Sequence, residues 1–412
     1  MKLSKVEISF DSKKLEDIDQ TIDNELKPKL KIFKKGERVA VACGSRGINN
    51  LNLIVKRVID NLKAIGTNPF IIPAMGSHGG ATAQGQIEVL KSLGITEEYI
   101  GVPIVSNMDT VKIKQKKLPL DIFIAKDSYE ADKTILINRI KPHTDFHGKF
   151  ESGLLKMSVL GLGKHDGALS VHQYGVKGLK EYMPKVAKFL IEKKYIDMGI
   201  AIVENAYDET LLIKALEAND IVSEEAKLLK IAKKNMPSLP VDEIDLLIIE
   251  RQGKNISGTG VDPNIIGRMK IPETLEPKWP SIKRIVVTDL TKESHGNAVG
   301  MGFADIITKK LFEKIDLRAV FENVSTATFL ERGKIPLVAD TSRQACETAL
   351  RSLGLGKIDY KKIRIIYILD TLHLSEIYVS SAIFKEIKSK VRLILKDVEI
   401  FDQQGELNGF KN

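Results

Sequence analysis

Histidine is scarce in this chain and unevenly distributed. The 412 residues contain seven histidines, and four of them lie within one stretch of thirty residues, at His143, His147, His165 and His172. A fifth, His78, lies in another glycine-rich segment. Imidazole titrates near neutral pH and also ligates transition metals. The cluster therefore indicates a catalytic or metal-binding site.

The segments around these histidines alternate between strand-like and helix-like patterns. Short runs rich in β-branched and other apolar residues at 39–43, 70–72 and 134–137 are typical of buried strands. Residues 51–65 place their apolar side chains on one helical stripe, and Thr82 is the expected N-cap of a further helix. This alternation predicts an α/β fold with mainly parallel sheets.

Three polar side chains come just after the predicted strands. Arg46 follows the first strand, His78 the second and His143 the third. In open α/β sheets, ligands bind beyond the carboxyl ends of the strands. We therefore expect three separate loops to deliver these side chains to one crevice.

The length of the chain predicts two domains. A boundary is expected near the proline pair at 237–240, because a new strand-like run begins at 246–249. The predicted division is an N-terminal α/β catalytic and cofactor domain over 1–240, which the 401–412 tail could rejoin, and a C-terminal α/β domain over 241–400. The active site is expected in the cleft between them.

Composition excludes several functional classes. The net charge is +9, but the lysines are scattered without interleaved aromatic residues, which argues against nucleic-acid binding and favours attraction of small anions. The chain has only two cysteines, Cys43 and Cys346, which are far apart in sequence. This low number fits a protein without disulfides from a reducing compartment. No signal-like core or membrane-length apolar run is present. We expect a cytoplasmic enzyme that does not bind membranes.

Common catalytic motifs are missing from the histidine-rich segment. The Gly-Leu-Gly-Lys sequence at 161–164 lacks the glycine spacing and the hydroxyl residue of a phosphate-binding P-loop. No dinucleotide-binding glycine motif, zinc-protease motif or hydrolase nucleophile motif occurs. His143 and His147 have a zinc-like spacing, but Pro142 and Gly148 argue against one helix carrying both.

The ordered set of motifs, taken together, is more informative than any one of them. The set comprises Arg46, the Gly-Ser-His-Gly-Gly-Ala-Thr turn at His78, the Lys-Pro-His ending at His143, the Ser-Gly-Leu-Leu-Lys-Met around Lys156, and His172 sixteen residues later. This order resembles the lactate racemase family, the nickel-pincer-nucleotide enzymes that racemise or epimerise 2-hydroxy acids.

The resemblance implies a cofactor and the residues that hold it. The cofactor is a pyridinium-3-thioamide-5-thiocarboxylic acid mononucleotide that carries nickel, and Lys156 would be its covalent attachment point. His172 would complete the nickel coordination through a neutral imidazole. Proteins of cofactor biosynthesis would then be transient partners of this chain.

The same resemblance implies a reaction at C2 of a 2-hydroxy acid. Removing a hydride from C2 avoids the carbanion that a neighbouring carboxylate disfavours. His78 and His143 would be the two bases that take and return the hydroxyl proton, and Arg46 would bind the substrate carboxylate. We expect a small-molecule 2-hydroxy acid as the substrate.

Two further residues enter the predicted site, and the sequence departs from the family pattern at others. Lys164 is predicted to contact the cofactor phosphate, and Arg268 is predicted to bind substrate from the C-terminal domain. Cys43 stands where better-known members have aspartate, and Gly79 where they have arginine. These departures argue against lactate itself as the substrate. The additional polar groups Lys141, Asp145, His147 and Asn264 would instead suit a polyhydroxylated sugar acid, as in an aldonate 2-epimerase.

Two other functional classes stay open at the level of sequence. One is a zinc-dependent hydrolase that uses His143, His147 and an acidic residue such as Asp145. The other is a non-catalytic protein that binds a nucleotide or a metal. An adduct on Lys156 together with nickel would favour the pincer enzyme, whereas zinc without an adduct would favour the hydrolase.

Overall fold

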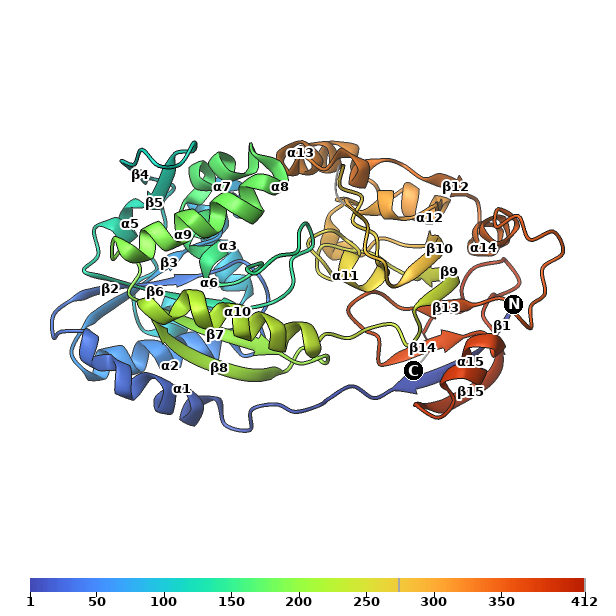
Figure 1. The fold of residues 1–412 in the computed structure, drawn as a ribbon, viewed down its shortest axis with the longest axis horizontal. Helices are drawn as coiled ribbons and strands as arrows, with labels where there is room; N and C mark the ends of the chain where they lie inside the picture. Colours follow the sequence, from blue (N-terminus) through green and yellow to red (C-terminus); the bar gives the residue numbers. More distant parts are fainter. Residues whose placement is uncertain (273–274, 411–412) are drawn as a thin grey trace. The chain divides into compact units, whose positions relative to one another are not determined.

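The computed structural model describes residues 1–272 and 275–410. The chain folds into two compact units (Figure 1). We call Asp11–Met236 the N-terminal unit, and Met1–Phe10 together with Pro237–Asn412 the C-terminal unit.

The N-terminal unit, all of whose residues are described, is built on a five-stranded sheet in the order β3-β2-β6-β7-β8. The first four of these strands are parallel to their neighbours, and β8 is antiparallel to β7. The predicted α/β class with a mainly parallel sheet is therefore confirmed. Its strands are β2 (Arg38–Cys43), β3 (Asn68–Pro73), β6 (Lys133–Arg139), β7 (Met198–Glu204) and β8 (Thr210–Glu217), beside a hairpin of β4 (Thr110–Ile113) and β5 (Ile122–Ala125).

Helices cover both faces of this sheet. Its longer helices are α1 (Ile18–Leu26), α2 (Leu51–Ala64), α3 (Ala83–Ser92), α7 (Lys164–His172), α9 (Met183–Glu192) and α10 (Ala218–Lys234). Shorter turns are α4 (Glu97–Ile100), α5 (Lys126–Tyr129), α6 (Leu154–Lys156), α8 (Gly175–Lys177) and the π-helical turns η3 (Met157–Gly161) and η4 (Gly178–Tyr182).

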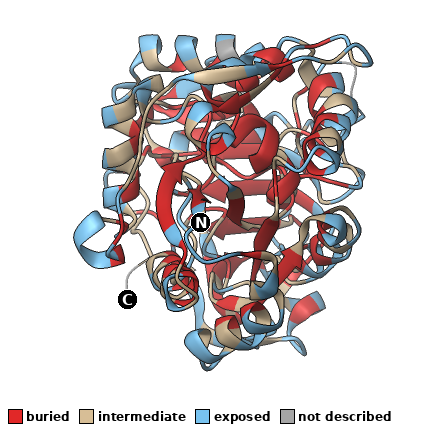
Figure 2. Cartoon of the chain, turned by 90° about the vertical axis from the view of Figure 1, so that its left-hand side faces the viewer, coloured by how far each residue is buried: buried red, intermediate tan, exposed pale blue. Residues whose placement is uncertain are grey.

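Alternate side chains of the central strands enter two separate hydrophobic cores. In β2, Val39 and Val41 pack with the apolar faces of α1 and α2, whereas Ala40 and Ala42 pack on the side of α9 and α10. Such alternation follows from the two-residue repeat of a strand. Figure 2 shows the result, with buried strands inside and exposed residues on the outer faces of the helices. The double cover makes the strands a rigid base for the loops at their ends.

The described part of the C-terminal unit holds an eight-stranded sheet in the order β12-β11-β10-β9-β13-β14-β1-β15. Strands β9 to β13 are parallel to their neighbours, and β14, β1 and β15 are antiparallel. The strands are β1 (Lys2–Ile8), β9 (Glu243–Ile249), β10 (Ser281–Val287), β11 (Ile306–Thr308), β12 (Leu337–Ala339), β13 (Ile365–Ile368), β14 (Glu376–Val379) and β15 (Val391–Glu399). The helices are α11 (Pro263–Ile266), α12 (Lys309–Phe312), α13 (Leu317–Ala327), α14 (Ser342–Arg351) and α15 (Ser381–Ile387).

The first strand of the chain departs from the predicted division at residues 1–240 and 241–400. Strand β1 pairs with β14 and β15 of the C-terminal unit, as Figure 1 shows by the blue strand beside the red ones. The 401–412 tail departs from it too: the amide of Ile400 donates to the carbonyl of Met1, and Phe401 belongs to the core of this unit. Pairing between two antiparallel neighbours satisfies the backbone groups of β1, which explains its placement.

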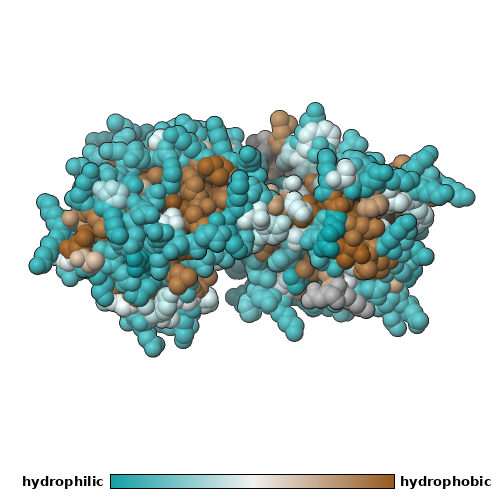
Figure 3. All heavy atoms as spheres, turned by 90° about the horizontal axis from the view of Figure 1, so that it is seen from below, coloured by the Kyte–Doolittle hydropathy of each residue, from teal (hydrophilic) through white to brown (hydrophobic). Residues whose placement is uncertain are grey.

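Surface and helix lengths agree with the composition. The face drawn in Figure 3 is mostly hydrophilic, with hydrophobic areas between the charged side chains. None of the helices within the described ranges combines the length and the apolar character needed to cross a membrane.

Candidate active site

The loops that carry the predicted site residues follow three neighbouring parallel strands. Cys43, the last residue of β2, is level with Pro73 at the end of β3 and with Ile137 near the end of β6. The carboxyl ends of the three strands therefore lie at one edge of the sheet, where ligands bind in folds of this kind. Arg46 and His143 leave from this edge.

The His78 loop connects β3 to α3 and touches the loop after β2. The hydroxyl of Ser45 makes a short hydrogen bond with Nδ1 of His78, whose side chain is exposed. Gly79 has φ +67°, and a Cβ built on it would lie 2.5 Å from the carbonyl carbon of Gly85. The loop is therefore held by a glycine-to-glycine backbone contact that leaves no room for side chains.

Lys164 holds the His78 loop in place through hydrogen bonds of its buried amine. Its side chain is buried, and Nζ donates to the carbonyl of Pro73 at 2.7 Å and to Oε1 of Gln86 at 3.1 Å. The amide of Gln86 in turn donates to the carbonyls of Gly76 and His78. Burial lowers the pKa of Lys164 to about 8. These contacts give Lys164 a structural role, which differs from the predicted contact with a cofactor phosphate.

The loop that carries His143 is held by a carboxylate. Glu151 is fully buried, and its oxygens accept the backbone N–H of His143 at 2.8 Å, the backbone N–H of Gly148 at 3.0 Å and Nζ of Lys233 at 2.6 Å. Nδ1 of His147 lies 3.3 Å from the same carboxylate. Burial alone would raise the pKa of Glu151, but these hydrogen bonds outweigh it and lower the pKa to about 2.

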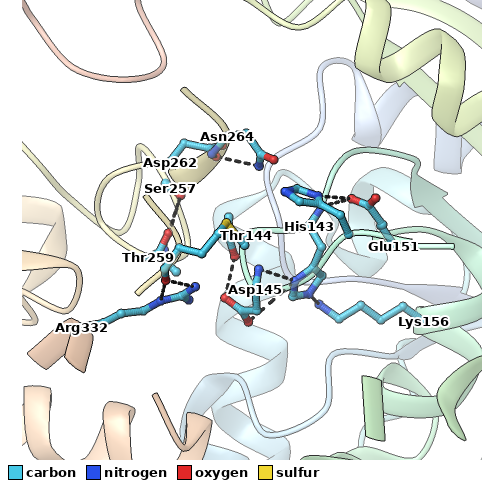
Figure 4. A network of polar contacts seen from close by, with 12 residues as sticks. His143, Thr144, Asp145, Glu151, Lys156, Ser257, Thr259, Asp262, Asn264 and Arg332 are labelled. Atoms are coloured by element: carbon cyan, nitrogen blue, oxygen red, sulfur yellow. Dashed lines mark hydrogen bonds and ion pairs between the residues drawn. The ribbon is translucent and has the colours of Figure 1, made fainter. Parts of the chain in front are cut away.

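The ring of His143 lies inside the protein, with 5 % of the residue exposed. Its Nδ1 accepts the backbone N–H of Asp145 at 2.9 Å, and the ring of Phe146 packs 4.6 Å away between centroids. Its Nε2 lies 2.5 Å from Nζ of Lys156, as the close view in Figure 4 shows. Burial, followed by the charge of Lys156, lowers the pKa of His143 to about 3.

Lys156 stands at the end of α6, directly before the π-helical turn η3. Burial lowers the pKa of Lys156 to about 8; Asp145 opposes this shift, and the positive charges of Arg46 and Lys141 add to it. Beneath this turn, the buried carboxyl of Glu225 accepts the backbone N–H of Leu155 at 2.9 Å. The amine therefore lies on a firmly held turn, in surroundings that favour its neutral form.

His172 ends helix α7 and shares the environment of Lys156. Burial lowers the pKa of His172, the charge of Lys156 lowers it further, and Asp145 opposes both. His143 is also sensitive to the charge of His172. The four side chains therefore lie within electrostatic reach of one another, and Lys156 and His172 are not on opposite sides of the unit.

The two predicted arginines have different surroundings. Arg46 reaches solvent, and although burial by the surrounding protein and the charge of Arg139 lower its pKa, the carboxylate of Asp145 opposes them. Arg268 belongs to the C-terminal unit, where its guanidinium donates to Asp305 at 3.0 Å and to the carbonyls of Phe303, Ile282 and Lys283. Arg268 is thus committed to contacts within its own unit, unlike the predicted substrate ligand.

The side chains near Lys156 fit a metal whose ligands come mainly from a bound organic group. Within the described ranges, no group of three or more His, Cys, Asp or Glu side chains is arranged to hold a metal ion. The zinc site considered from the sequence is not favoured, because Nδ1 of His143 accepts a backbone N–H and Nδ1 of His147 faces Glu151. A neutral imidazole at His172 and an amine at Lys156 match an organic group that attaches covalently and supplies the remaining metal ligands.

Sequence reasoning missed the residues that hold the loops. Glu225 could have been found from the sequence, because it lies on the same face of α10 as the buried Ile221, Leu228 and Leu229. A carboxylate is unexpected on such an apolar face. Glu151 and its partner Lys233 are 82 positions apart and gave no such signal.

Comparison with known proteins adds to this geometry. Residues 2–177 match the model of the lactate racemase N-terminal domain. The fold is similar to that of the lactate racemase apoprotein from Thermoanaerobacterium thermosaccharolyticum, with a TM-score of 0.57 and 12% identity over 90% of this chain and 99% of that one. It is also similar to a protein from Thermotoga maritima, with a TM-score of 0.54 and 14% identity over 86% and 96% of the two chains. No curated protein matches the chain significantly.

Proposed function

We propose that this chain, whose residues 2–177 match the lactate racemase N-terminal domain, is a member of that family that inverts C2 of a 2-hydroxy acid with a nickel-pincer nucleotide. The observation that carries the proposal is the meeting of His143, Lys156 and His172 in one electrostatic cluster. Arg46 and the His78 loop leave the same edge of the sheet.

Two residues would hold the cofactor. Lys156 offers an amine for covalent attachment, and His172 offers a neutral imidazole as a metal ligand. When bound, the group supplies an acceptor and donor for the hydride of C2. The remaining chemistry falls to side chains of this chain.

Those side chains bind the substrate and move its hydroxyl proton. The Arg46 guanidinium would bind the substrate carboxylate in a fork. His78 and His143 would each take the hydroxyl proton from one configuration and return it to the other. A histidine base contributes typically about 10²–10⁴-fold to such a step.

Polar groups near His143 support a substrate larger than lactate. Lys141, Asp145 and His147 lie on the same loop as this base, and Asp145 and Lys141 act electrostatically on Lys156. Such groups suit the extra hydroxyls of a sugar acid, so the proposed reaction is a 2-epimerisation of an aldonate. We also propose a cytoplasmic location. It fits the two cysteines, because both are buried free thiols.

The experiment uses protein loaded with cofactor and aldonates deuterated at C2. Hydride return predicts epimerised product that keeps deuterium at C2, whereas exchange with solvent would point to carbanion chemistry and contradict the proposal. His78→Ala should keep nickel and lose turnover, and His172→Ala should lose nickel. His165→Gln, on the exposed side of α7, is the matched control and should keep both.

A further inference from the structure

The hydrogen bonds of His143 determine where its proton lies. Nδ1 accepts the backbone N–H of Asp145 at 2.9 Å, so this nitrogen carries a lone pair and no hydrogen. A neutral imidazole has one N–H and one lone pair. The proton of His143 is therefore on Nε2.

That proton points at Lys156. Nε2 of His143 lies 2.5 Å from Nζ of Lys156, so Nε2–H donates and Nζ must accept. An ammonium has three donors and no acceptor, whereas a neutral amine has a lone pair. A doubly protonated ring is disfavoured, because it would set an N–H against the N–H of Asp145 and because His143 is almost fully buried.

We propose that, before any cofactor is attached, His143 stabilises the neutral-amine form of Lys156, and that this pair occupies Nε2 of His143 until Lys156 has reacted. The inference deepens the proposed function and rests on it for the identity of the attached group. It requires of that group only a carbon electrophile, such as a carbonyl or thiocarboxyl carbon.

The charges around Lys156 agree with a neutral amine. Burial is the largest influence and lowers the pKa of Lys156 to about 8, and Arg46 and Lys141 act in the same direction. Asp145 is the carboxylate that opposes them. His172 also interacts electrostatically with Lys156, and its own pKa is lowered.

Attachment of the cofactor to Lys156 would remove the hydrogen bond between Nε2 of His143 and Nζ of Lys156. Acylation forms an N–C bond from Nζ to the carboxyl or thiocarboxyl carbon while the C–O or C–S bond of that carbon breaks, and the leaving group departs as water or hydrogen sulfide with one proton of Nζ. The lone pair of the nitrogen is then delocalised into the amide or thioamide, so that Nζ no longer accepts Nε2–H. Loading of Lys156 thus ends the contact between Nζ and Nε2 of His143, and a substrate hydroxyl could take the place of Nζ at this nitrogen. His78 instead pairs with Ser45.

Trapping by an aldehyde tests the neutral amine without nickel, cofactor or substrate. The unloaded chain is mixed with pyridoxal 5′-phosphate, whose aldehyde condenses with an amine to an imine with loss of water, and borohydride then supplies the hydride that makes the product permanent. Peptide mass spectrometry measures labelling of each lysine between pH 6 and 10. Lys156 should be half-labelled near pH 8, and exposed lysines only near their ordinary value of about 10.4. Labelling of Lys156 in step with exposed lysines would overturn the proposal.

Two variants separate the hydrogen bond from burial. His143→Phe keeps the buried ring and removes the donor, so labelling of Lys156 at pH 7 should fall about tenfold, as expected for the loss of one hydrogen bond. His165→Gln should label like the wild type. An unchanged Lys156 profile in His143→Phe would contradict the role of His143.

Nitrogen NMR of histidine-labelled, unloaded protein decides the case if the aldehyde cannot reach Lys156. The signals of His143, assigned through His143→Phe, should show the Nε2–H tautomer at pH 9, where Lys156 is mostly a neutral amine. An Nδ1–H tautomer or an imidazolium would overturn the proposal. Because none of these assays measures epimerisation, the inference can fail while the proposed function holds, and the reverse.

Discussion

The two loops that carry the candidate bases are built by opposite means. The His78 loop is held by backbone contact between Gly79 and Gly85, and it leaves the imidazole exposed. The His143 loop is held by the buried carboxylate of Glu151, and it buries the imidazole against Lys156.

This difference separates two tasks. A glycine-held turn places a side chain without adding charge, so His78 keeps the surroundings of a solvent-exposed base. A carboxylate-held loop fixes several backbone amides at once, so His143 can be buried beside an amine at a defined distance. In the proposed mechanism His78 would act on the substrate, whereas His143 would act both on the substrate and on the attachment of Lys156.

The largest effect is expected from removing the carboxylate. Glu151→Ala leaves the amides of His143 and Gly148 and the ammonium of Lys233 without their acceptor. We expect a loss of about 3–5 kcal/mol in the free energy of unfolding, as for other broken buried ion pairs. Urea unfolding measures it, with Glu151→Gln, which keeps one acceptor oxygen, as the milder control. A loss below about 1 kcal/mol would mean that Glu151 does not hold the loop.

A somewhat smaller loss in the free energy of unfolding is expected at acidic pH. The folded pKa of Glu151 is about 2, below its ordinary 4.5, so its charged form stabilises the fold at all pH values above about 4.5. That contribution, about 3 kcal/mol, should disappear as the pH falls from 4.5 through 2. Unfolding free energies of wild type and Glu151→Gln should therefore converge on acidification, and parallel curves would contradict the assignment.

The glycine-held loop should respond to one added methyl group. A Cβ on Gly85 would lie 1.9 Å from the carbonyl oxygen of Gly79, so Gly85→Ala forces the His78 loop to move. We expect a loss of about 1–3 kcal/mol, with turnover impaired and Lys156 labelling intact. Gly80→Ala has open space at the same turn, although its φ is +65°, and should cost about 1 kcal/mol or less. Equal effects of the two changes would argue against the backbone contact.

The smallest effect is expected at Ser45. Ser45→Ala removes the hydroxyl that contacts exposed His78, which should change the free energy of unfolding by less than about 1 kcal/mol. The pH profile of turnover should shift, because the imidazole loses a partner, while Ser45→Thr should restore it. A profile identical to wild type would mean that this contact does not tune His78.

The sequence predicted most of the local structure around the site. Residues 51–65 and 134–137 revealed α2 and β6 through their apolar spacing, and Thr82 does cap α3 by accepting the amide of Gly85 at 3.0 Å. The rule that ligands bind at the carboxyl ends of strands placed Arg46, and the loops after β3 and β6, at one edge of the sheet.

Features that depend on distant partners could not be predicted. Strand β1 joins a sheet whose neighbours, β14 and β15, lie more than 350 positions away in sequence. The contacts of Glu151 with Lys233 and of Lys164 with Pro73 have no local signature either. Lys164 was predicted to bind a phosphate because a lysine beside glycines resembles a phosphate-binding loop. In the structure its buried amine instead donates to Pro73 and Gln86.

The attachment of a cofactor to Lys156 can be measured by peptide mass spectrometry and metal analysis of protein produced alongside the cofactor-biosynthesis proteins. We expect a nucleotide-sized adduct on Lys156 and nickel that is retained by the wild type and lost in His172→Ala. Full epimerase activity in a chain whose Lys156 is unmodified would contradict this expectation.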